Sequence, residues 1–236
     1  MKKINLILVG TLFISLLFAS CFYGIKGNGK VVKSERQVEN FESIEVSAGL
    51  DLILIQDSVI KVVVEADENL QKIIKTEVSH GKLKIYPETG IRHAASKKVF
   101  VTIKNINSLQ ANSGAGVKSK MELKLKSIDI SVSSGADIDL ALSASKMRVE
   151  GSSGGNVDLS GTVENLDVDG SSGVNINVSD LKSVNCNAGA SSGAKLKITV
   201  TEKLIAKASS GGQIKVTGDP KEKDIQKSSG GDVSFR

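Results

Sequence analysis

The sequence has few of the residues that organise ordinary globular cores or interrupt strands. Aromatic residues make up 3% of the 236 positions, tryptophan is absent, and Pro87 and Pro220 are the only prolines. So few rings exclude a core built on aromatic side chains, and they leave little with which to stack sugars. Scarce proline suits strands that are paired on both sides, because proline removes a backbone donor. We therefore expect a thin aliphatic core among uninterrupted strands.

Cysteine and charge exclude further classes of protein. Cys21 and Cys186 are the only cysteines, and Cys186 falls at an inward position of its strand, so we expect a small buried hydrophobe and no intramolecular disulfide. The formal charge is +5, and it falls to +3 if residues 1–20, with Lys2 and Lys3, are removed. Acids and bases are interspersed throughout. Such a mild balance predicts no nucleic-acid partner.

What the chain has instead is a recurring Ser-Gly step from Ser113 onward, usually Ser-Ser-Gly. The glycines lie 18 to 21 residues apart, and a branched aliphatic residue follows three positions after each one. A repeat of this length without a helical pattern indicates the coils of a solenoid, which stack to share a core. The repeat glycines are Gly114, Gly135, Gly154, Gly173, Gly193, Gly211 and Gly230.

Side chains around each repeat glycine alternate between apolar and polar, the two-residue period of β-strands. We expect at least two short strands in each coil, meeting at a sharp corner. The apolar positions after the glycines are Val117, Ile138, Leu140, Val157, Leu159, Ile176, Val178, Leu196, Ile198, Ile214, Val216, Val233 and Phe235. Those before the glycines are Ile128, Ile130, Val132, Met147, Val149, Leu166, Val168, Val184, Cys186, Leu204 and Ala206.

Glycine suits the corner because it tolerates positive φ and lets successive coils approach closely. By the same alternation, the serine directly before each glycine is expected to face inward and to bond backbone groups or the serine of the next coil. A column of nucleophilic serines is not expected. A nucleophilic serine needs a base, and both His80 and His93 lie outside the repeat.

The sequence therefore predicts an all-β fold, a right-handed parallel β-helix with coils of about 19 residues and a more irregular N-terminal capping region. Residues 109–236 carry the regular repeats, and residues 36–108 carry the first coils and the cap. Within the cap, Ser47-Ala48-Gly49 is interpreted as a degenerate corner and His80-Gly81 as a tight turn. Asp67 is expected to cap a short helix carrying Leu70, Ile73 and Ile74.

The start of the chain predicts export. Two lysines precede an apolar run over residues 4–18, and small residues then lead to Cys21, the order of a cleaved export signal. Residues 17–21 resemble a bacterial lipoprotein signal, in which the cysteine is acylated and becomes the first mature residue. An ordinary signal peptide cleaved near Cys21, or an uncleaved anchor, is the alternative.

Under the lipoprotein interpretation, residues 1–20 are the signal peptide and residues 21–35 are the lipid anchor and tether. Several acyl chains on Cys21 would hold the protein stably at a membrane. We expect a cell-envelope location at the outer membrane, with the leaflet left open.

The motifs of the capping region resemble a known family. They are Phe41-x-x-Ile44-x-Val46, Val62-x-Val64-x-Ala66-Asp67-Glu68-Asn69 and Gly81-x-Leu83-x-Ile85, followed by the Ser-Ser-Gly corners. Together they are similar to the putative auto-transporter adhesin, head GIN domain family, over roughly residues 36–230. The resemblance implies an exported, often lipid-anchored β-helical protein common in Bacteroidetes, without established activity. It supplies no catalytic or binding residues.

Outward polar side chains of adjacent coils form the candidate ligand face. Its members are Asp137, Asp139, Asn156, Asp158, Asp167, Asp169, Asn175 and Asn177. We expect a non-catalytic binding or structural module that presents this face to an extended glycan or an envelope protein, with no cofactor. The alternative is a polysaccharide-acting enzyme that uses the five aspartates as a carboxylate cluster.

Two further features of the repeat bear on binding and assembly. Residues 154–159 resemble a fragment of the calcium-binding nonapeptide repeat, but the longer interval and the missing aspartates predict no metal site. The chain stops inside the last predicted strand, at residues 233–236. We expect either the N-terminal region or a second subunit, in a homo-oligomer, to cover that open end.

Overall fold

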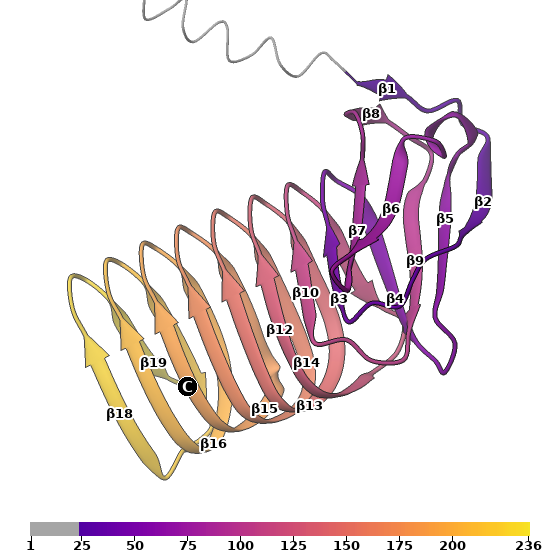
Figure 1. Ribbon diagram of the computed structural model, residues 1–236. Coiled ribbons are helices and arrows are strands. Elements are labelled where there is room, and N and C mark those ends of the chain that lie inside the picture. The colour runs from indigo at the N-terminus through magenta and orange to yellow at the C-terminus, as the bar shows by residue number, and fades with distance from the viewer. Residues whose placement is uncertain (1–23) are drawn as a thin grey trace, which may run out of the picture.

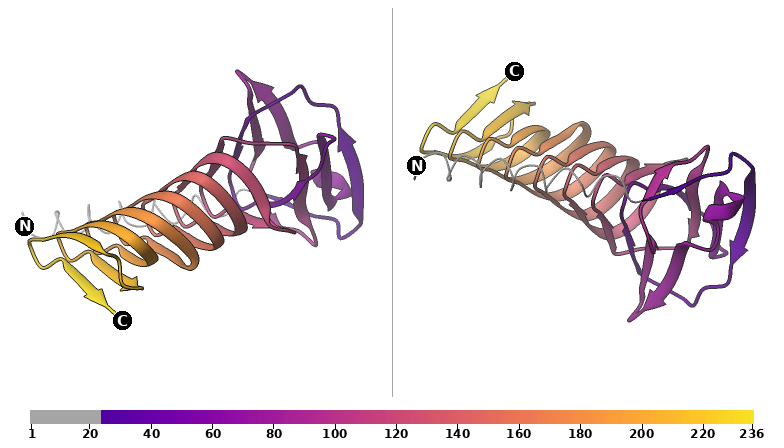
Figure 2. Two further views of the ribbon diagram at one scale, coloured as in Figure 1. Left: turned by 90° about the horizontal axis from the view of Figure 1, so that it is seen from below. Right: turned by 90° about the horizontal axis from the view of Figure 1, so that it is seen from above.

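The computed structural model describes residues 24–236, and this part of the chain is built almost entirely of strands (Figure 1). The predicted signal peptide and Cys21 lie outside the described residues. Within residues 24–236, no helix has the length and apolarity needed to cross a bilayer. Figure 2 shows coils stacked along one axis, with a broader cap of N-terminal strands at one end.

From β10 onward the chain winds in stacked coils, and each strand pairs in parallel with the equivalent strand of the next coil. The strands are β10 (Ser108–Ala111), β11 (Gly116–Ser119), β12 (Leu123–Val132), β13 (Asp137–Gly151), β14 (Asn156–Gly170), β15 (Asn175–Ala190), β16 (Lys195–Ala208), β17 (Gln213–Thr217), β18 (Glu222–Lys227) and β19 (Asp232–Phe235). The predicted right-handed parallel β-helix is confirmed. The expectation of two short strands per coil is wrong for β13 to β16, which run 14 to 16 residues without interruption.

Each corner is a tight turn made by two successive left-handed residues. Ser134 has φ 53° and Gly135 has φ 70°, and the Ala136 N–H donates to the Ser133 carbonyl at 3.1 Å. Positive φ at both central residues is the signature of a type I′ turn. Because such a pair interrupts the two-residue alternation, Ser134 is exposed, and so are its equivalents at the other corners. The prediction that these serines face inward is wrong.

The repeat glycines are needed for their backbone conformation alone. All seven have φ between 70° and 75°, which confirms the predicted positive φ. A Cβ added at any of them would meet nothing within 4 Å, so the expected close approach of coils is not the reason for glycine here.

The corners of successive coils are joined by a hydrogen-bonded ladder. The Gly135 N–H donates to the Ser153 carbonyl at 3.2 Å, and the same bond recurs along the column. The degenerate corner belongs to this ladder: Ala48 and Gly49 have φ 56° and 72°, and the Gly49 N–H donates to the Ser113 carbonyl at 3.0 Å. Its interpretation as a corner is confirmed.

The aliphatic columns inside the coils are buried as predicted, with two corrections. Phe235 is 44% exposed, because no further coil covers β19 within the described part of the chain. Val184 is 39% exposed, because the pairing of β15 with β16 shifts register between Ser183 and Asn185, and Ser183 is buried instead. Cys186 is 3% exposed, which confirms it as a buried hydrophobe.

The N-terminal strands both continue the solenoid and cover its end. They are β1 (Ile25–Lys26), β2 (Val31–Arg36), β3 (Ser43–Val46), β4 (Asp51–Gln56), β5 (Lys61–Asp67), β6 (Ile74–Ser79), β7 (Lys82–Pro87), β8 (Ile91–His93) and β9 (Lys97–Ile103). β3 and β4 pair in parallel with β10 and β11, whereas β5 pairs antiparallel with both β2 and β9, and β6 with β7. His80 and Gly81, with φ 51° and 73°, form the turn between β6 and β7, as predicted.

Asp67 does not cap a helix. Only a 3-10 turn, Glu68–Leu70, follows it, and Ile74 already begins β6. The Asp67 carboxylate is fully buried and accepts hydrogen bonds from the backbone N–H groups of Gly29 at 2.7 Å, Ala95 at 2.9 Å and Ser96 at 3.0 Å. The bond from Ser96 above all, aided by those from Gly29 and Ala95, holds the pKa of Asp67 below its usual value against the opposing effect of burial.

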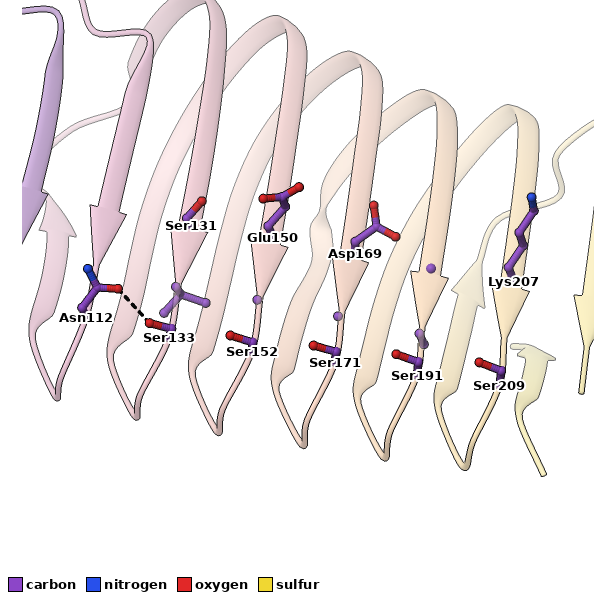
Figure 3. Close-up of a pocket in the computed structure, with 15 residues that line it drawn as sticks. Asn112, Ser131, Ser133, Glu150, Ser152, Asp169, Ser171, Ser191, Lys207 and Ser209 are labelled. Carbon is purple, nitrogen blue, oxygen red and sulfur yellow. Dashed lines mark hydrogen bonds between the residues drawn. The ribbon is translucent and has the colours of Figure 1, made fainter. Parts of the chain in front are cut away.

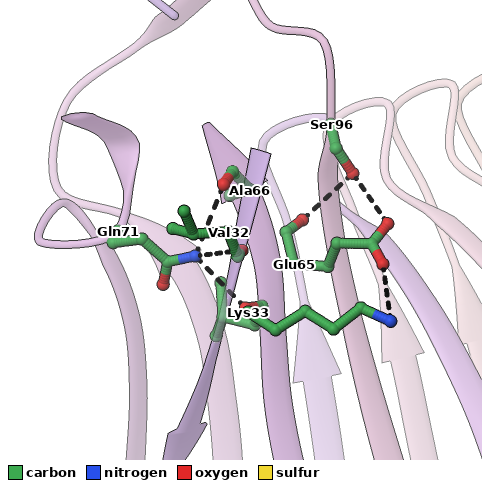
Figure 4. A network of polar contacts seen from close by, with 7 residues as sticks. Val32, Lys33, Glu65, Ala66, Gln71 and Ser96 are labelled. Atoms are coloured by element: carbon green, nitrogen blue, oxygen red, sulfur yellow. Dashed lines mark hydrogen bonds and ion pairs between the residues drawn. The ribbon is translucent and has the colours of Figure 1, made fainter. Parts of the chain in front are cut away.

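A second polar network ties the cap strands together (Figure 4). The Gln71 side-chain amide donates to the carbonyls of Val32 at 2.9 Å and Val64 at 3.2 Å, and so links β2 to β5. The Ser96 hydroxyl donates to the Glu65 carbonyl at 3.1 Å, and Glu65 also pairs with Lys33 at 3.2 Å. These bonds satisfy polar groups where antiparallel strands close the end of the solenoid.

Candidate functional site

A groove of about 610 Å³ crosses six coils, on the segments that lead into the corners (Figure 3). We call it the serine groove, after the first serine of each Ser-Ser-Gly step. These serines stand in a row along it: Ser133, Ser152, Ser171, Ser191 and Ser209. Strands in register lie about 4.8 Å apart, so the row spans about 19 Å.

Most hydroxyls of this row are free to bind something else. The Ser133 hydroxyl donates to the Asn112 side-chain oxygen at 2.8 Å. The hydroxyls of Ser152, Ser171, Ser191 and Ser209 have no hydrogen-bond partner among residues 24–236. Each can donate one hydrogen bond and accept two, so the groove offers a regular series of both kinds of group.

The serine groove is lined by small residues, and the core explains why. Val132, Gly151, Gly170 and Ala190 are aligned one residue before the serines. A Cβ at Gly151 would lie 2.6 Å from Cγ2 of Val174, and one at Gly170 would lie 2.7 Å from Cδ1 of Leu196 and 2.9 Å from Cγ1 of the same valine. Val174 therefore occupies the space that side chains on these two glycines would need.

One coil earlier, the valine lies before the corner and the glycine lies after it. A Cβ on Gly155 would lie 3.0 Å from Cγ2 of Val132, so a valine before the corner faces a glycine after it. Large and small residues thus alternate between the two sides of the corner, as close packing of a core requires.

Charged side chains border the serine groove in another aligned column, Ser131, Glu150, Asp169, Gly189 and Lys207. Partial burial, and then the charge of Asp167, raise the pKa of Asp169. The Asp169 carboxylate lies over Gly189, in the space that a Cβ at this position would need. Lys207 is exposed and makes no ion pair within residues 24–236. The column is acidic at its middle and basic at its C-terminal end.

The Glu150 carboxylate is held by Arg148. The Arg148 Nε donates to Glu150 Oε1 at 2.8 Å, and this bond, together with the charge of Glu150, raises the pKa of Arg148. Asp169 and Lys207 are therefore the charged groups of the column that remain available to a ligand.

The structure divides the predicted ligand face between the two sides of the corner. Asp167 and Asp169 precede the corner, whereas the other members follow it. The members that follow the corner are Asp137, Asp139, Asn156, Asp158, Asn175 and Asn177. The five aspartates do not form one cluster, and only Asp169 lines the serine groove.

Several members of the predicted face bond to one another between coils. The Asn156 side-chain amide donates to Asp137 at 2.8 Å, and Asn175 donates to Asn156 at 3.1 Å. In the neighbouring column, Asn177 donates to Asp158 at 2.8 Å. These ladders stabilise the stack and occupy groups that were predicted to face a ligand.

The sequence pattern placed Asp169 among the outward polar residues but did not single out the row of serines beside it. The first serine lies two residues before the glycine, and Asp169 lies two residues before Ser171, so both fall on outward positions of the strand that enters the corner. The outward positions of the entering strand place the hydroxyl row beside Asp169 and Lys207. The alternation of the entering strand was the available signal.

Candidate metal ligands and histidines bear on the chemistry open to the described part of the chain. No group of three histidine, cysteine, aspartate or glutamate side chains in residues 24–236 is arranged to hold a metal ion. His80 and His93 lie in the cap, on the β6–β7 turn and on β8, outside the serine groove.

The fold and the groove together define a parallel β-solenoid, capped at its N-terminal end and carrying a polar groove along its flank. Residues 40–220 match the family described as "Putative auto-transporter adhesin, head GIN domain", and the chain belongs to that family. The predicted resemblance is confirmed. Membership of an adhesin-labelled family indicates an exported, cell-surface protein.

Solved structures share this fold. A putative adhesin from Bacteroides fragilis NCTC 9343 has a TM-score of 0.82 and 19% identity, covering 90% of this chain and 100% of that one. A putative lipid binding protein from Parabacteroides distasonis ATCC 8503 has a TM-score of 0.72 and 20% identity, covering 91% and 100%. A putative adhesin from Parabacteroides merdae ATCC 43184 has a TM-score of 0.69 and 19% identity, covering 90% and 99%. No protein with a curated description matches this chain.

Proposed function

We propose that this chain is a non-catalytic cell-envelope lipoprotein that binds an extended glycan or protein partner along its solenoid. The observation that carries the proposal is the serine groove, in which four unpartnered hydroxyls recur at the spacing of the coils. Attachment through a lipidated Cys21, at the outer membrane, follows from the lipoprotein-like start of the sequence. The adhesin label of the family supports a binding role.

The arrangement of the groove disfavours catalysis. Most glycoside hydrolases use a pair of carboxyl groups that flank the bond to be cleaved. Glu150 and Asp169 are the two carboxylates of the serine groove, but Glu150 is held by Arg148. Its serines have no histidine beside them to act as a base.

The groove also bears on the lipid binding named for the Parabacteroides distasonis structure. Sites for small apolar ligands are concave and mostly apolar. Here hydroxyls, two carboxylates and an ammonium border the groove, and its apolar members, such as Val132 and Ala190, are short aliphatic side chains. This chemistry supports a polar, extended partner.

The test uses the full chain, purified from envelopes in detergent, on a glycan array and on immobilised envelope proteins. Retention of the chain by glycans or by a protein, without release of products from polysaccharides, is the expected result. Product release would establish the enzyme instead, and the absence of any partner in both formats would contradict the binding role.

A further inference from the structure

Resting on the proposed function, we infer that the ligand of the serine groove is a linear glycan that lies across the coils, with an acidic group seated beside Lys207. The inference names one class of partner, fixes its position, and gives it a direction along the solenoid. It rests on three properties of the groove: which backbone groups are taken, which hydroxyls are free, and where the unpaired charge lies.

The backbone of the serine groove is closed to a peptide. The Ser171 N–H donates to the Gly151 carbonyl at 3.0 Å, and the Ser191 N–H donates to the Gly170 carbonyl at 2.9 Å. An extended peptide gains its affinity by adding to a free sheet edge, and the groove runs across strands that are already paired on both sides. It also lacks the deep apolar pockets in which protein interfaces anchor aromatic side chains.

The free hydroxyls match a polyhydroxylated chain. Ser152, Ser171, Ser191 and Ser209 each present a group that both donates and accepts, at about 4.8 Å intervals. Sugar hydroxyls also do both, so successive units of a glycan can replace the water that these serines would otherwise bind. Because the groove has no aromatic ring on which a sugar could stack, each unit binds weakly, and affinity accumulates along the polymer.

The charges give the bound chain a direction. The Asp169 carboxylate lies over Gly189, and Lys207 follows Gly189 one coil later on the same column. A sugar unit seated beside Asp169 would donate a hydroxyl to its carboxylate, and the next acidic group would meet the unpaired ammonium of Lys207. A uronate-containing glycan should therefore bind better than a neutral glycan of equal length.

The first experiment measures hydroxyl recognition by isothermal titration of the full chain in detergent. The ligands are linear oligosaccharides from disaccharide to octasaccharide, in neutral and uronate-containing series. Affinity should rise with length until the ligand spans the row of about 19 Å. Replacing Ser171→Ala and Ser191→Ala together should weaken binding of the long ligands about tenfold. Ser145→Ala removes an exposed hydroxyl of β13 that lines no part of the groove and should change nothing.

The second experiment isolates the charge. Lys207→Gln should abolish the preference for uronate over neutral ligands and leave the dependence on length intact. Lys195→Gln is the matched control, because Lys195 is exposed on the other side of the corner and makes no ion pair within residues 24–236. Added salt should weaken the uronate series more than the neutral series.

The outcomes separate the inference from the proposed function. If glycans bind but the serine and Lys207 variants behave like their controls, the inference is overturned and the binding role stands. If only envelope proteins bind, the inference is overturned in the same way. If neither class binds, both fail. Length-dependent binding that the paired serine substitution weakens would support the glycan in the groove.

Discussion

At the scale of single residues, backbone conformation decides what the corner will accept. Seven serines hold φ between 47° and 53°, a region that asparagine and glycine enter easily and β-branched residues avoid. The two-residue alternation could place Ile138 and Val157 inside from the sequence. It could not predict that Ser134 is exposed, because two successive left-handed residues interrupt the alternation of inward and outward side chains. It could not foresee the partners of Asp67 either, which lie far from it in the chain.

Substitutions at one corner test this conformational demand. Ser172→Val should lower the free energy of unfolding by about 1–2 kcal/mol, because a β-branched residue is strained at positive φ, whereas Ser172→Asn should preserve or raise it. Chemical denaturation measures both. Ser145→Val is the control, because at an exposed strand position valine is favoured. Equal effects of valine at the two sites would argue against the strained corner.

The buried carboxylate of Asp67 gives a pH dependence. Its folded pKa is depressed below the unfolded value of about 3.9, so its stabilising effect is present above that pH and is lost as the pH falls through the folded pKa. Asp67→Asn should lower the thermal midpoint at pH 7, and should flatten its further decline between about pH 4 and pH 2. Thermal melts across this range measure the difference.

Asp180→Asn is the matched control for Asp67, because Asp180 is exposed and its side chain makes no hydrogen bond or ion pair within residues 24–236. Parallel acid profiles for Asp67→Asn and the unchanged chain would contradict the role assigned to the three backbone donors.

At the scale of elements, neighbouring coils are coupled through matched side-chain volumes. Outward positions such as Asn156 and Asn175 join the coils by ladders, while inside them Val174 fills the space left by Gly151 and Gly170. The repeat predicts that coils stack, but it cannot say which valine faces which glycine. That depends on how strands on the two sides of a corner pack in space. Val184 shows the same limit, since its exposure follows from a register shift between two coils.

A double-mutant cycle measures this coupling. Gly151→Ala should destabilise the chain by about 1–3 kcal/mol, because its Cβ would press on Val174. In a Val174→Ala background the same change should cost less, with a coupling free energy of about 1 kcal/mol. Val216→Ala provides the distant background, in which the effects should simply add. Additivity in both backgrounds would rule out the proposed contact.

At the scale of the whole molecule, the chain is a rod whose coils touch only their neighbours and whose N-terminal end is covered by antiparallel strands. The sequence predicted this shape well, because repetition specifies a solenoid. It did not predict the serine groove, since this groove arises where three columns meet beside the corners. Self-association through the C-terminal end stays a prediction.

The reactivity of the two cysteines tests both the burial of Cys186 and the acylation of Cys21. Burial, and then the charge of Asp167, raise the pKa of Cys186 to about 12, so its native thiol should not react with a thiol reagent at pH 8. In denaturant, the chain taken from cell envelopes should yield one reactive thiol if Cys21 is acylated. Two thiols would contradict lipidation, and rapid reaction of the folded chain would contradict the burial of Cys186.

The alternation of valine and glycine across the corners also makes each coil pack differently from the next. Repeats that are nearly identical can dock one position out of place during folding, and the misaligned product retains most of its hydrogen bonds. A slip of one coil between the two sides of the corner would bring Val174 towards Val132, where there is no glycine to receive it. Differences between residues at equivalent positions thus disfavour misaligned docking of similar coils.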